Sequence, residues 1–239
     1  MIQRGLIETD WGWFGYLVSD AGLLATVLPG PRGVVEKALA RRASGVTRDG
    51  RASRATASGV LRIEPRTSVR AEVHEENGAD APRGLKPAAS SRRSRITPSV
   101  IETESREFER AVRDYFKGRR VAFDVPLDLR AISPFRRRVL VECSKIPWGE
   151  TCSYADLARA AGSPRATRAA GSAMAHNPMP LVIPCHRVLA SNGGIGGFSS
   201  TNGVREKIRM LTLEGAWTDG ITHTSARPKT RRVRGLQLV

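Results

Sequence analysis

The segment 181–188, Leu-Val-Ile-Pro-Cys-His-Arg-Val, brings together the residue types that nucleophilic chemistry requires. The apolar run before Pro184 predicts a short buried strand, and a proline that cannot continue a strand places Cys185 at its end. A thiol beside cationic side chains is favoured as the reactive thiolate. The alternative is a structural cysteine, because free cysteines are often fully buried. The neighbours His186 and Arg187 argue against that alternative, since polar side chains are costly in an apolar core.

Two short helices joined by a glycine turn are predicted upstream of this segment. Ser153, with Asp156 three residues later, forms the capping-box pattern of a helix start. Ser163-Pro164 then predicts the start of a second helix over 165–175, which Asn177-Pro178 ends. This layout is typical of a DNA-binding helix-turn-helix, although many helical hairpins look similar.

The second helix carries arginines among small side chains. Its residues are Arg165, Ala166, Thr167, Arg168, Ala169, Ala170, Gly171, Ser172 and Ala173. Small side chains let a helix backbone come close to whatever it meets, which fits either tight packing in the core or insertion into a DNA groove. In the second case arginine is the only long probe.

The N-terminal part of the chain predicts a sheet with flanking helices. Apolar runs at 11–18 and 23–28, separated by Ser-Asp-Ala-Gly, predict an antiparallel hairpin, and 34–41 predicts a short helix. Further along, a helical stripe is followed by Gly118, and 121–127 alternates like an edge strand ended by Pro126. The stripe consists of Phe108, Ala111, Val112, Tyr115 and Phe116.

Two more helices and a loop complete the C-terminal half. Ser133-Pro134 predicts a helix start, with Phe135, Val139, Leu140 and Cys143 on its buried face, so we expect Cys143 to be a core residue. The glycine-rich stretch 191–200 lacks a nucleotide-binding context and fits a pocket wall with Phe198 as its stacking surface. A last helix spans 203–215. Its predicted inward residues are Val204, Ile208 and Leu211, and Glu214 lies at its end.

These patterns divide the chain into five segments. Residues 1–43 and 99–130 form an N-terminal α/β domain, interrupted by a disordered basic linker at 44–98 that lacks a persistent apolar period. A mainly α-helical domain, with the helix-turn-helix and the active-site strand, spans 131–216, and 217–239 is a disordered basic tail.

Composition narrows the setting. The formal net charge of +16 favours a polyanionic partner, most simply nucleic acid. Three cysteines without CxxC spacing argue against a disulfide framework or a structural zinc site, and for a reducing compartment. Because neither a signal peptide nor a membrane-length apolar stretch is present, we expect a cytoplasmic protein, nucleoid-associated in a bacterium.

Pro184-Cys-His-Arg-Val188, with Asn177-Pro178, Ser153-Tyr154 and the arginine helix, resembles the O6-alkylguanine-DNA alkyltransferases, the methylated-DNA–protein-cysteine methyltransferases. The resemblance runs from about residue 133 to 215. It implies a ribonuclease-H-like α/β sheet in the N-terminal domain, ahead of the helical DNA-binding domain. It also implies direct DNA repair, in which an O6-alkylguanine, or an O4-alkylthymine, is flipped out and its alkyl group moves irreversibly to the protein.

The resemblance assigns roles to individual residues. Cys185 is the nucleophile, His186 its base through a water, and Glu214 the group that orients the histidine. On the DNA side, Arg168 fills the gap left by the flipped nucleotide and Tyr154 helps rotate its phosphate. The recognition helix contributes Arg165, Ala166, Thr167, Ala169 and Gly171, and the pocket and its support are Asn177, Val188, Phe198 and Ser199. Phe198 stands where some members have tyrosine.

The resemblance also sets expectations about partners. The protein needs no cofactor, carries no metal site, and acts as a monomer on double-stranded DNA without an obligate protein partner. Two alternatives remain: a non-catalytic lesion-sensing DNA binder, and a regulatory helix-turn-helix protein whose cysteine is structural. The role of Arg187 also stays open, since its charge could favour the thiolate or its guanidinium could bond loop carbonyls.

Overall fold

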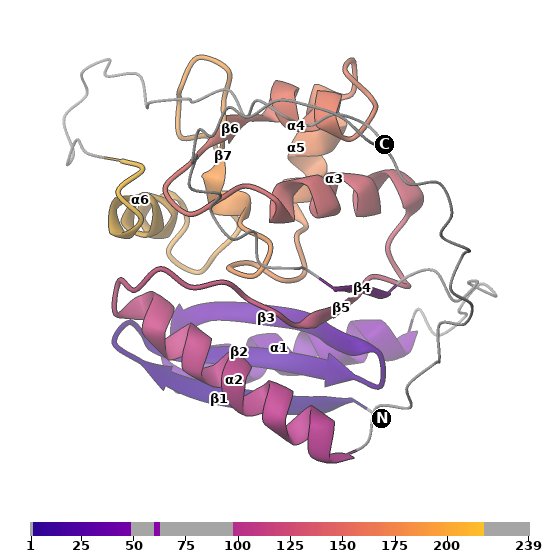
Figure 1. Ribbon diagram of the computed structural model, residues 1–239, viewed down its shortest axis with the longest axis vertical. Helices are drawn as coiled ribbons and strands as arrows, with labels where there is room; N and C mark the ends of the chain where they lie inside the picture. The colour runs from indigo at the N-terminus through magenta and orange to yellow at the C-terminus, as the bar shows by residue number, and fades with distance from the viewer. Residues whose placement is uncertain (1, 49–59, 63–97, 218–239) are drawn as a thin grey trace, which may run out of the picture.

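The computed structural model describes residues 2–48, 60–62 and 98–217, with side chains over 2–44 and 105–217. A five-stranded sheet forms one layer and a group of helices lies along the side of it that carries β3 and β5 (Figure 1). The sheet order is β1-β2-β3-β5-β4, in which β3 and β5 are parallel and the other neighbours antiparallel. Its strands are β1 (Gln3–Thr9), β2 (Gly12–Ser19), β3 (Gly22–Gly30), β4 (Val60–Arg62) and β5 (Pro126–Asp128).

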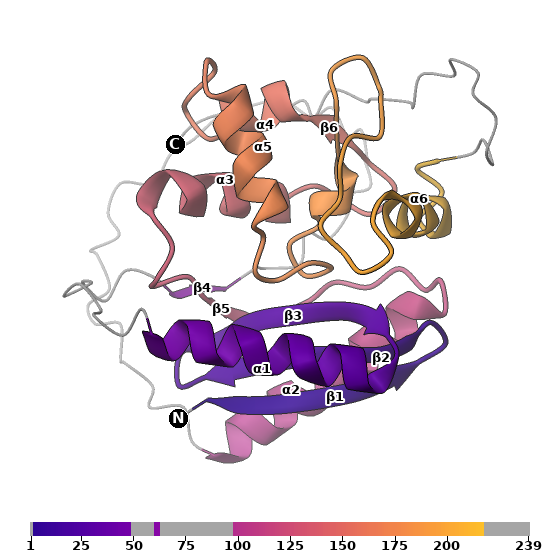
Figure 2. The same ribbon diagram turned by 180° about the vertical axis from the view of Figure 1, so that it is seen from behind.

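The two faces of the sheet are covered by one helix each. Helix α2 (Pro98–Phe116) lies on the face seen in Figure 1, and α1 (Arg32–Arg48) on the opposite face (Figure 2). The predicted hairpin is confirmed as β2 and β3, and most of the predicted stripe of α2 is buried. Gly118 follows the helix with a φ of 79°, a value that glycine adopts without strain.

The C-terminal layer contains α3 (Pro134–Ser144), α4 (Tyr154–Ala160), α5 (Thr167–Ala175) and α6 (Val204–Leu213). Two short parallel strands, β6 (Cys152–Ser153) and β7 (Val188–Leu189), join the start of α4 to the segment after Cys185. The capping box of Ser153 with Asp156 is confirmed. So is the core position of Cys143, whose side chain is fully buried.

Backbone contacts join the two layers beside the active segment. Thr26 in β3 donates its backbone N–H to the Pro178 carbonyl and its hydroxyl to the Pro180 carbonyl, at 2.9 and 2.6 Å. The Arg42 guanidinium of α1 also binds the Pro178 carbonyl, at 2.6 Å. The sheet layer therefore holds the chain between α5 and Cys185.

Several predicted boundaries differ from the structure. The segment predicted as a linker includes the end of α1, the edge strand β4 and the first residue of α2, while the remainder of 44–98 and residues 218–239 lie outside the described residues. The strand predicted over 121–127 is wrong: β5 begins at Pro126, where no amide hydrogen is needed at a strand start, and it lies inside the sheet, not at its edge.

Two further corrections concern the C-terminal layer. Helix α5 begins at Thr167, because 164–165 form a turn after Ser163 instead of the first helical residues. The inward face of α6 is rotated from the prediction: its buried residues are Glu206, Lys207, Met210 and Leu211, whereas Val204 and Ile208 are half-buried.

Candidate active site

Cys185 opens η1 (Cys185–Arg187), a single 3₁₀ turn, and is 6% exposed. The strand predicted before it is absent. Leu181 takes a φ of 80° and 181–182 form a turn, so that only an isolated bridge joins Pro180 to Ile183. The Asn177 side chain stabilises this turn with two hydrogen bonds. Its Oδ1 accepts from the Met179 backbone N–H, and its Nδ2 donates to the Ile183 carbonyl at 2.8 Å. The thiol therefore lies on a tightly bonded turn.

The Glu214 carboxylate is the centre of a buried polar cluster next to this turn. His186 Nε2 lies 2.8 Å from its Oε1, and both side chains are 0% exposed. Arg187 donates twice, Nε to Oε2 at 2.8 Å and Nη2 to Oε1 at 2.9 Å, and its Nη1 binds the Ile146 carbonyl. Tyr115 donates its hydroxyl to Oε1 at 2.7 Å. The structure thus brings His186 and Glu214 together.

This cluster fixes which nitrogen of His186 carries the proton. The pKa of Glu214 lies well below its usual range, through its contacts with His186 and Arg187, so the carboxylate is ionised and can only accept hydrogen bonds. Nε2 must then be protonated, which leaves Nδ1 as the basic nitrogen of the neutral ring. Nδ1 is buried and has no hydrogen-bond partner among the described residues. Burial lowers the pKa of His186, which favours that neutral form.

The contacts of Arg187 bear on its open role. Its guanidinium binds the Glu214 carboxylate and the Ile146 carbonyl, which favours the structural alternative. Burial raises the pKa of the Cys185 thiol, and this increase is opposed by a hydrogen bond from Asn177, by the charge of Lys207 and by backbone hydrogen bonds. The free protein therefore holds a protonated thiol among groups that stabilise its anion.

Lys207 is the buried cation near this thiol. Its Nζ donates to the Val188 carbonyl at 2.6 Å, and burial lowers the pKa of the amine to about 8. The ring of Tyr154 lies 5.9 Å from the same nitrogen. Lys207 therefore faces both the active turn and the start of the helix-turn-helix.

The residues predicted to contact DNA lie mainly at the surface of the helix-turn-helix. Arg165, Arg168 and Ala169 are exposed, and Ala166, Thr167 and Gly171 are partly exposed. Tyr154 is half-buried beside Gly171 and the glycine-rich loop. Of the predicted pocket residues, Phe198 packs on the main core cluster and Ser199 is exposed. The Tyr154 ring lies between these two groups, beside Gly171 and beside Gly196 of the loop.

Sequence reasoning missed Tyr115, a member of the Glu214 cluster, and Lys207, the buried lysine beside the turn. Tyr115 was predicted only as part of an apolar stripe, and Lys207 was not singled out. A polar side chain on the buried face of an amphipathic helix was the available signal in both cases, because such a group needs a partner in the core.

The described residues contain no group of three or more His, Cys, Asp or Glu side chains suited to holding a metal ion. In the same part of the chain, no helix is both long and apolar enough to cross a bilayer.

Comparison with known proteins identifies the family. Residues 134–216 match the model of the 6-O-methylguanine DNA methyltransferase, DNA binding domain. The constitutive methylated-DNA–protein-cysteine methyltransferase of Bacillus subtilis is 36% identical over 49% of this chain and 67% of its own length. The methylated-DNA–protein-cysteine methyltransferase of Archaeoglobus fulgidus is 42% identical over 50% of this chain and 81% of its own length. The methylated-DNA–protein-cysteine methyltransferase of Mycolicibacterium paratuberculosis is 45% identical, and the matched part is 59% of its length.

Solved structures agree on the fold. The crystal structure of Mycobacterium tuberculosis O6-methylguanine methyltransferase covers 92% of this chain and 97% of its own, at 21% identity and a TM-score of 0.53. The OGT of the same organism has been crystallised in complex with DNA; that structure covers 44% of this chain and 62% of its own, at 41% identity and a TM-score of 0.42. The predicted combination of an N-terminal sheet domain and a mainly helical C-terminal domain is confirmed. The chain belongs to the O6-methylguanine DNA methyltransferase family, the methylated-DNA–protein-cysteine methyltransferases of DNA repair.

Proposed function

We propose that this protein repairs O6-alkylguanine in double-stranded DNA by moving the alkyl group to Cys185 and keeping it there. The observation that carries the proposal is the buried turn that places a thiol directly before His186, whose Nε2 is held by Glu214 at 2.8 Å. Nucleophile, base and orienting carboxylate are the parts of an activated thiol. The turn and Glu214 both lie within residues 134–216, which match the family's DNA-binding domain.

The reaction follows from these groups. His186 Nδ1 takes the thiol proton through a bridging water, and the carboxylate of Glu214 stabilises the imidazolium that forms. The Cys185 thiolate attacks the alkyl carbon, so that an S–C bond forms as the O6–C bond breaks. The electron pair stays on the guanine, which accepts the proton from the imidazolium. The product is a neutral thioether with no group to hydrolyse it, so each molecule acts once and requires no cofactor.

Access to O6 requires the base to leave the stack, because the atom is hidden inside a duplex. Helix α5 presents exposed Arg168 among small side chains, which suits it to enter a groove and fill the space of the extruded nucleotide. Tyr154, at the start of α4, assists rotation of the phosphate. These are the roles that the resemblance to the alkyltransferases assigns to Arg168 and Tyr154.

The flipped guanine would lie against the segment that follows Cys185. The Val188 carbonyl accepts a hydrogen bond from Lys207 and keeps a second lone pair for an exocyclic amine of the base. Phe198 and Ser199 of the glycine-rich loop complete the pocket. O4-alkylthymine is the second substrate within this proposal.

The setting of the protein belongs to the proposal too. The domains are 1–43 with 99–130, extended by the end of α1 up to Arg48 and by β4 (Val60–Arg62), and 131–216. The protein acts as a monomer in the cytoplasm, bound to double-stranded DNA through the helix-turn-helix. The hydrogen bonds from Thr26 and Arg42 to the segment before Cys185 support the view that both layers of one chain act together.

The test is transfer of a labelled methyl group from duplex DNA that contains O6-methylguanine. We expect one label per protein molecule, bound to Cys185, and its loss in Cys185→Ala. Cys152→Ala is the matched control, because Cys152 is a half-buried thiol that lies just before α4 and is expected to keep the activity. Intact DNA binding without label on the wild-type protein would refute the proposal and favour a lesion-sensing or regulatory DNA binder.

A further inference from the structure

One residue of the sheet layer reaches the catalytic cluster. Tyr115 lies near the end of α2, is fully buried, and donates its hydroxyl to Glu214 Oε1 at 2.7 Å. The hydroxyl oxygen of Tyr115 lies 3.5 Å from His186 Nε2. Its ring packs edge-on against Trp148 and Phe116, with ring centroids 5.2 and 5.0 Å away. Packing against these two aromatic rings therefore restrains the position of the hydroxyl.

Tyr115 differs from the other groups that bind this carboxylate. Oε1 accepts from Tyr115, His186 and Arg187, and Oε2 accepts from Arg187. The long approach of the Gly149 amide to Oε2, at 3.5 Å, also comes from the C-terminal layer. Among the described residues, Tyr115 is thus the donor that the N-terminal part of the chain contributes. Burial and Glu214 raise the pKa of Tyr115 well above its usual value, so it stays a donor at every working pH.

We infer that Tyr115 is a positioning residue for alkyl transfer: its hydroxyl fixes the Glu214 carboxylate, which in turn orients His186. The inference rests on the proposed function, because orienting His186 matters only if that ring serves Cys185. Through this hydrogen bond from α2, the N-terminal layer would help to position the Glu214 carboxylate and the His186 ring.

Loss of this hydroxyl has a predictable electrostatic effect. With one donor to Oε1 fewer, the negative charge of Glu214 is less neutralised, so the carboxylate stabilises the imidazolium more strongly. The pKa of His186 then rises, and a larger fraction of the ring is protonated and unable to act as a base. The charged groups that act on His186 are Glu214, Arg187 of η1 and Lys207 of α6, and Tyr115→Phe alters none of these side chains.

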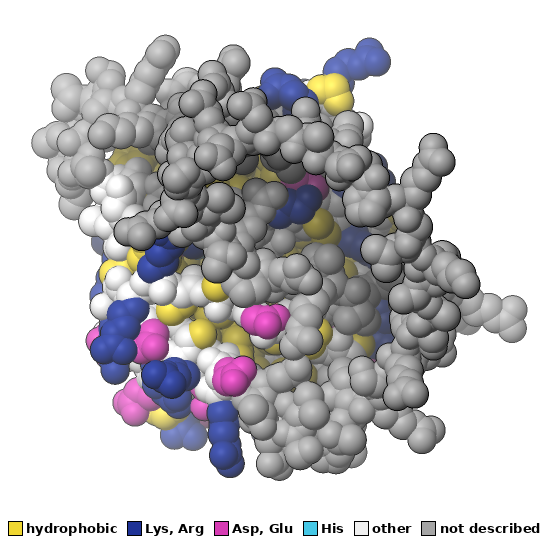
Figure 3. All heavy atoms as spheres, viewed as in Figure 1, with side chains coloured by type: hydrophobic (Ala, Val, Ile, Leu, Met, Phe, Trp, Pro, Cys, Tyr) yellow, Lys and Arg dark blue, Asp and Glu magenta, His cyan; other side chains and the backbone are white. Residues whose placement is uncertain are grey.

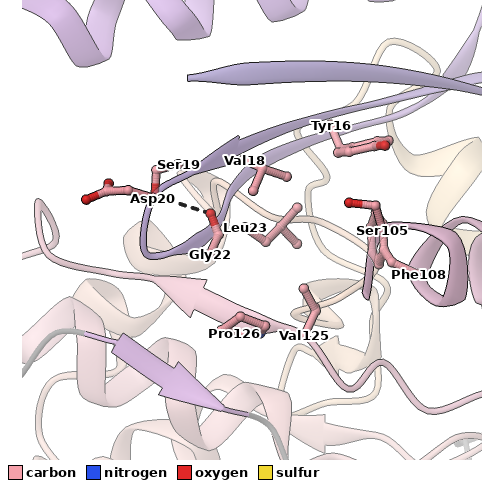
Figure 4. Close-up of a pocket in the computed structure, with 10 residues that line it drawn as sticks. All are labelled: Tyr16, Val18, Ser19, Asp20, Gly22, Leu23, Ser105, Phe108, Val125 and Pro126. Atoms are coloured by element: carbon pink, nitrogen blue, oxygen red, sulfur yellow. Dashed lines mark hydrogen bonds between the residues drawn. The ribbon is translucent and has the colours of Figure 1, made fainter. Parts of the chain in front are cut away.

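The variant Tyr115→Phe isolates the hydroxyl, because phenylalanine keeps the ring packing. Tyr16→Phe is the matched control. Tyr16 is a second buried tyrosine that binds a glutamate, Glu109 of α2, at 2.9 Å, and its ring lines a mostly apolar hollow between the β2–β3 turn, α2 and β5 (Figure 4). Both changes remove one tyrosine–glutamate hydrogen bond, but only the first touches Glu214.

Two measurements on the full-length chain decide the inference. Single-turnover methyl transfer across pH is expected to be about tenfold slower in Tyr115→Phe at neutral pH, on the scale of one hydrogen bond to a charged group, with its acidic limb moved to higher pH. Nitrogen-15 NMR of labelled histidine is expected to show His186 titrating at higher pH in this variant. Affinity for duplex DNA is expected to match the wild type, and Tyr16→Phe to match it in every measurement.

The outcomes separate this inference from the proposed function. Equal rates, pH profiles and His186 titrations in Tyr115→Phe and Tyr16→Phe would overturn the inference, even where the wild type transfers the alkyl group. A lower stability of Tyr115→Phe without a change in the His186 titration would also overturn it, since the contact would then be only structural. Failure of the wild type to transfer would overturn the proposed function, while the His186 titration still decides whether Tyr115 sets that ring.

Discussion

The Cys185 turn and helix α5 lie side by side in the chain but are built in opposite ways. Around the turn, His186 and Glu214 are fully buried and every Glu214 oxygen is bound by protein donors. Arg168 on α5 and Arg165 in the turn before it are exposed, and within the described part of the chain neither forms a hydrogen bond or ion pair with another side chain. The groups proposed for catalysis are thus fixed by hydrogen bonds within the fold. The arginines proposed to contact DNA are exposed and have no side-chain partner among the described residues.

Exposed charge alone does not mark the DNA-facing side. Over α2, basic and acidic side chains are interspersed (Figure 3), and Arg113 pairs with Glu109 while Arg119 pairs with Asp114. Such exposed pairs contribute about 0–1 kcal/mol each. The difference from α5 is that its one arginine, Arg168, has no acidic residue on its own helix.

Glu214→Gln should have the largest effect on the fold. The neutral amide leaves the Arg187 guanidinium buried without a counter-charge, which costs about 3–5 kcal/mol of unfolding free energy. The pKa of Glu214 is depressed below its ordinary 4.5, so its contribution is complete above pH 4.5 and declines as pH falls below that value. Denaturant unfolding at pH 7 and pH 3.5 is expected to show a difference from wild type that shrinks in acid.

The control for this prediction is Glu36→Gln, which removes an exposed pair with Arg32. A change below about 1 kcal/mol is expected there. Methyl transfer by Glu214→Gln is expected to fall by about a hundredfold, the scale of a positioned general base. A stability equal to wild type at pH 7 would show that the buried cluster is not held by this carboxylate.

Lys207→Met tests whether every buried polar group stabilises the fold. The folded amine has a pKa of about 8 against 10.5 for an ordinary lysine, so keeping it charged costs stability at pH 7. This cost to stability is present below pH 8, where the folded amine is charged. Between pH 8 and 10.5 the folded amine is neutral while the lysine of the unfolded chain is still protonated, so stability rises with pH. Wild type should gain up to about 3 kcal/mol relative to Lys207→Met between pH 8 and 10.5.

Urea unfolding of both proteins at intervals from pH 7 to 10 measures this gain. Lys145→Met, at a lysine that is 41% exposed, is the control and should show a constant difference from wild type. At pH 7 the variant Lys207→Met should be at least as stable as wild type while its transfer is slower, since the cation near Cys185 is gone. If the unfolding free energies of wild type and Lys207→Met changed equally with pH, the lowered pKa of the buried Lys207 amine would be contradicted.

The contrast between local and long-range signals also explains what the sequence could predict. The Ser153 capping box, the β2–β3 hairpin and the buried face of α2 depend on residues a few positions apart, and all three are confirmed. The strand expected before Cys185 fails because Asn177 bonds the backbone of the following segment and stabilises a turn, which an apolar run does not reveal.

The polar cluster shows the same limit more sharply. Periodicity placed Tyr115 in the core, but its partner Glu214 is 99 residues away, so the contact could not be read from local spacing. Periodicity also favoured Val204 and Ile208 as the inward residues of α6. The helix is turned instead so that Lys207 meets the Val188 carbonyl, a partner supplied by the tertiary fold.

Arg168→Ala should have the smallest effect on the fold and the most selective effect on repair. The side chain is exposed, so a stability change within about 0.5 kcal/mol is expected. Transfer from duplex DNA should slow by about tenfold, because an extruded base leaves a gap whose filling offsets part of a cost of a few kcal/mol. Transfer from free O6-benzylguanine should be unchanged, since no base has to be flipped.

Arg159→Ala, at an exposed arginine of α4 that pairs with Asp156, is the control and should leave both rates intact. Equal losses on the duplex and the free base would assign Arg168 to the catalytic turn and remove the distinction between the two regions.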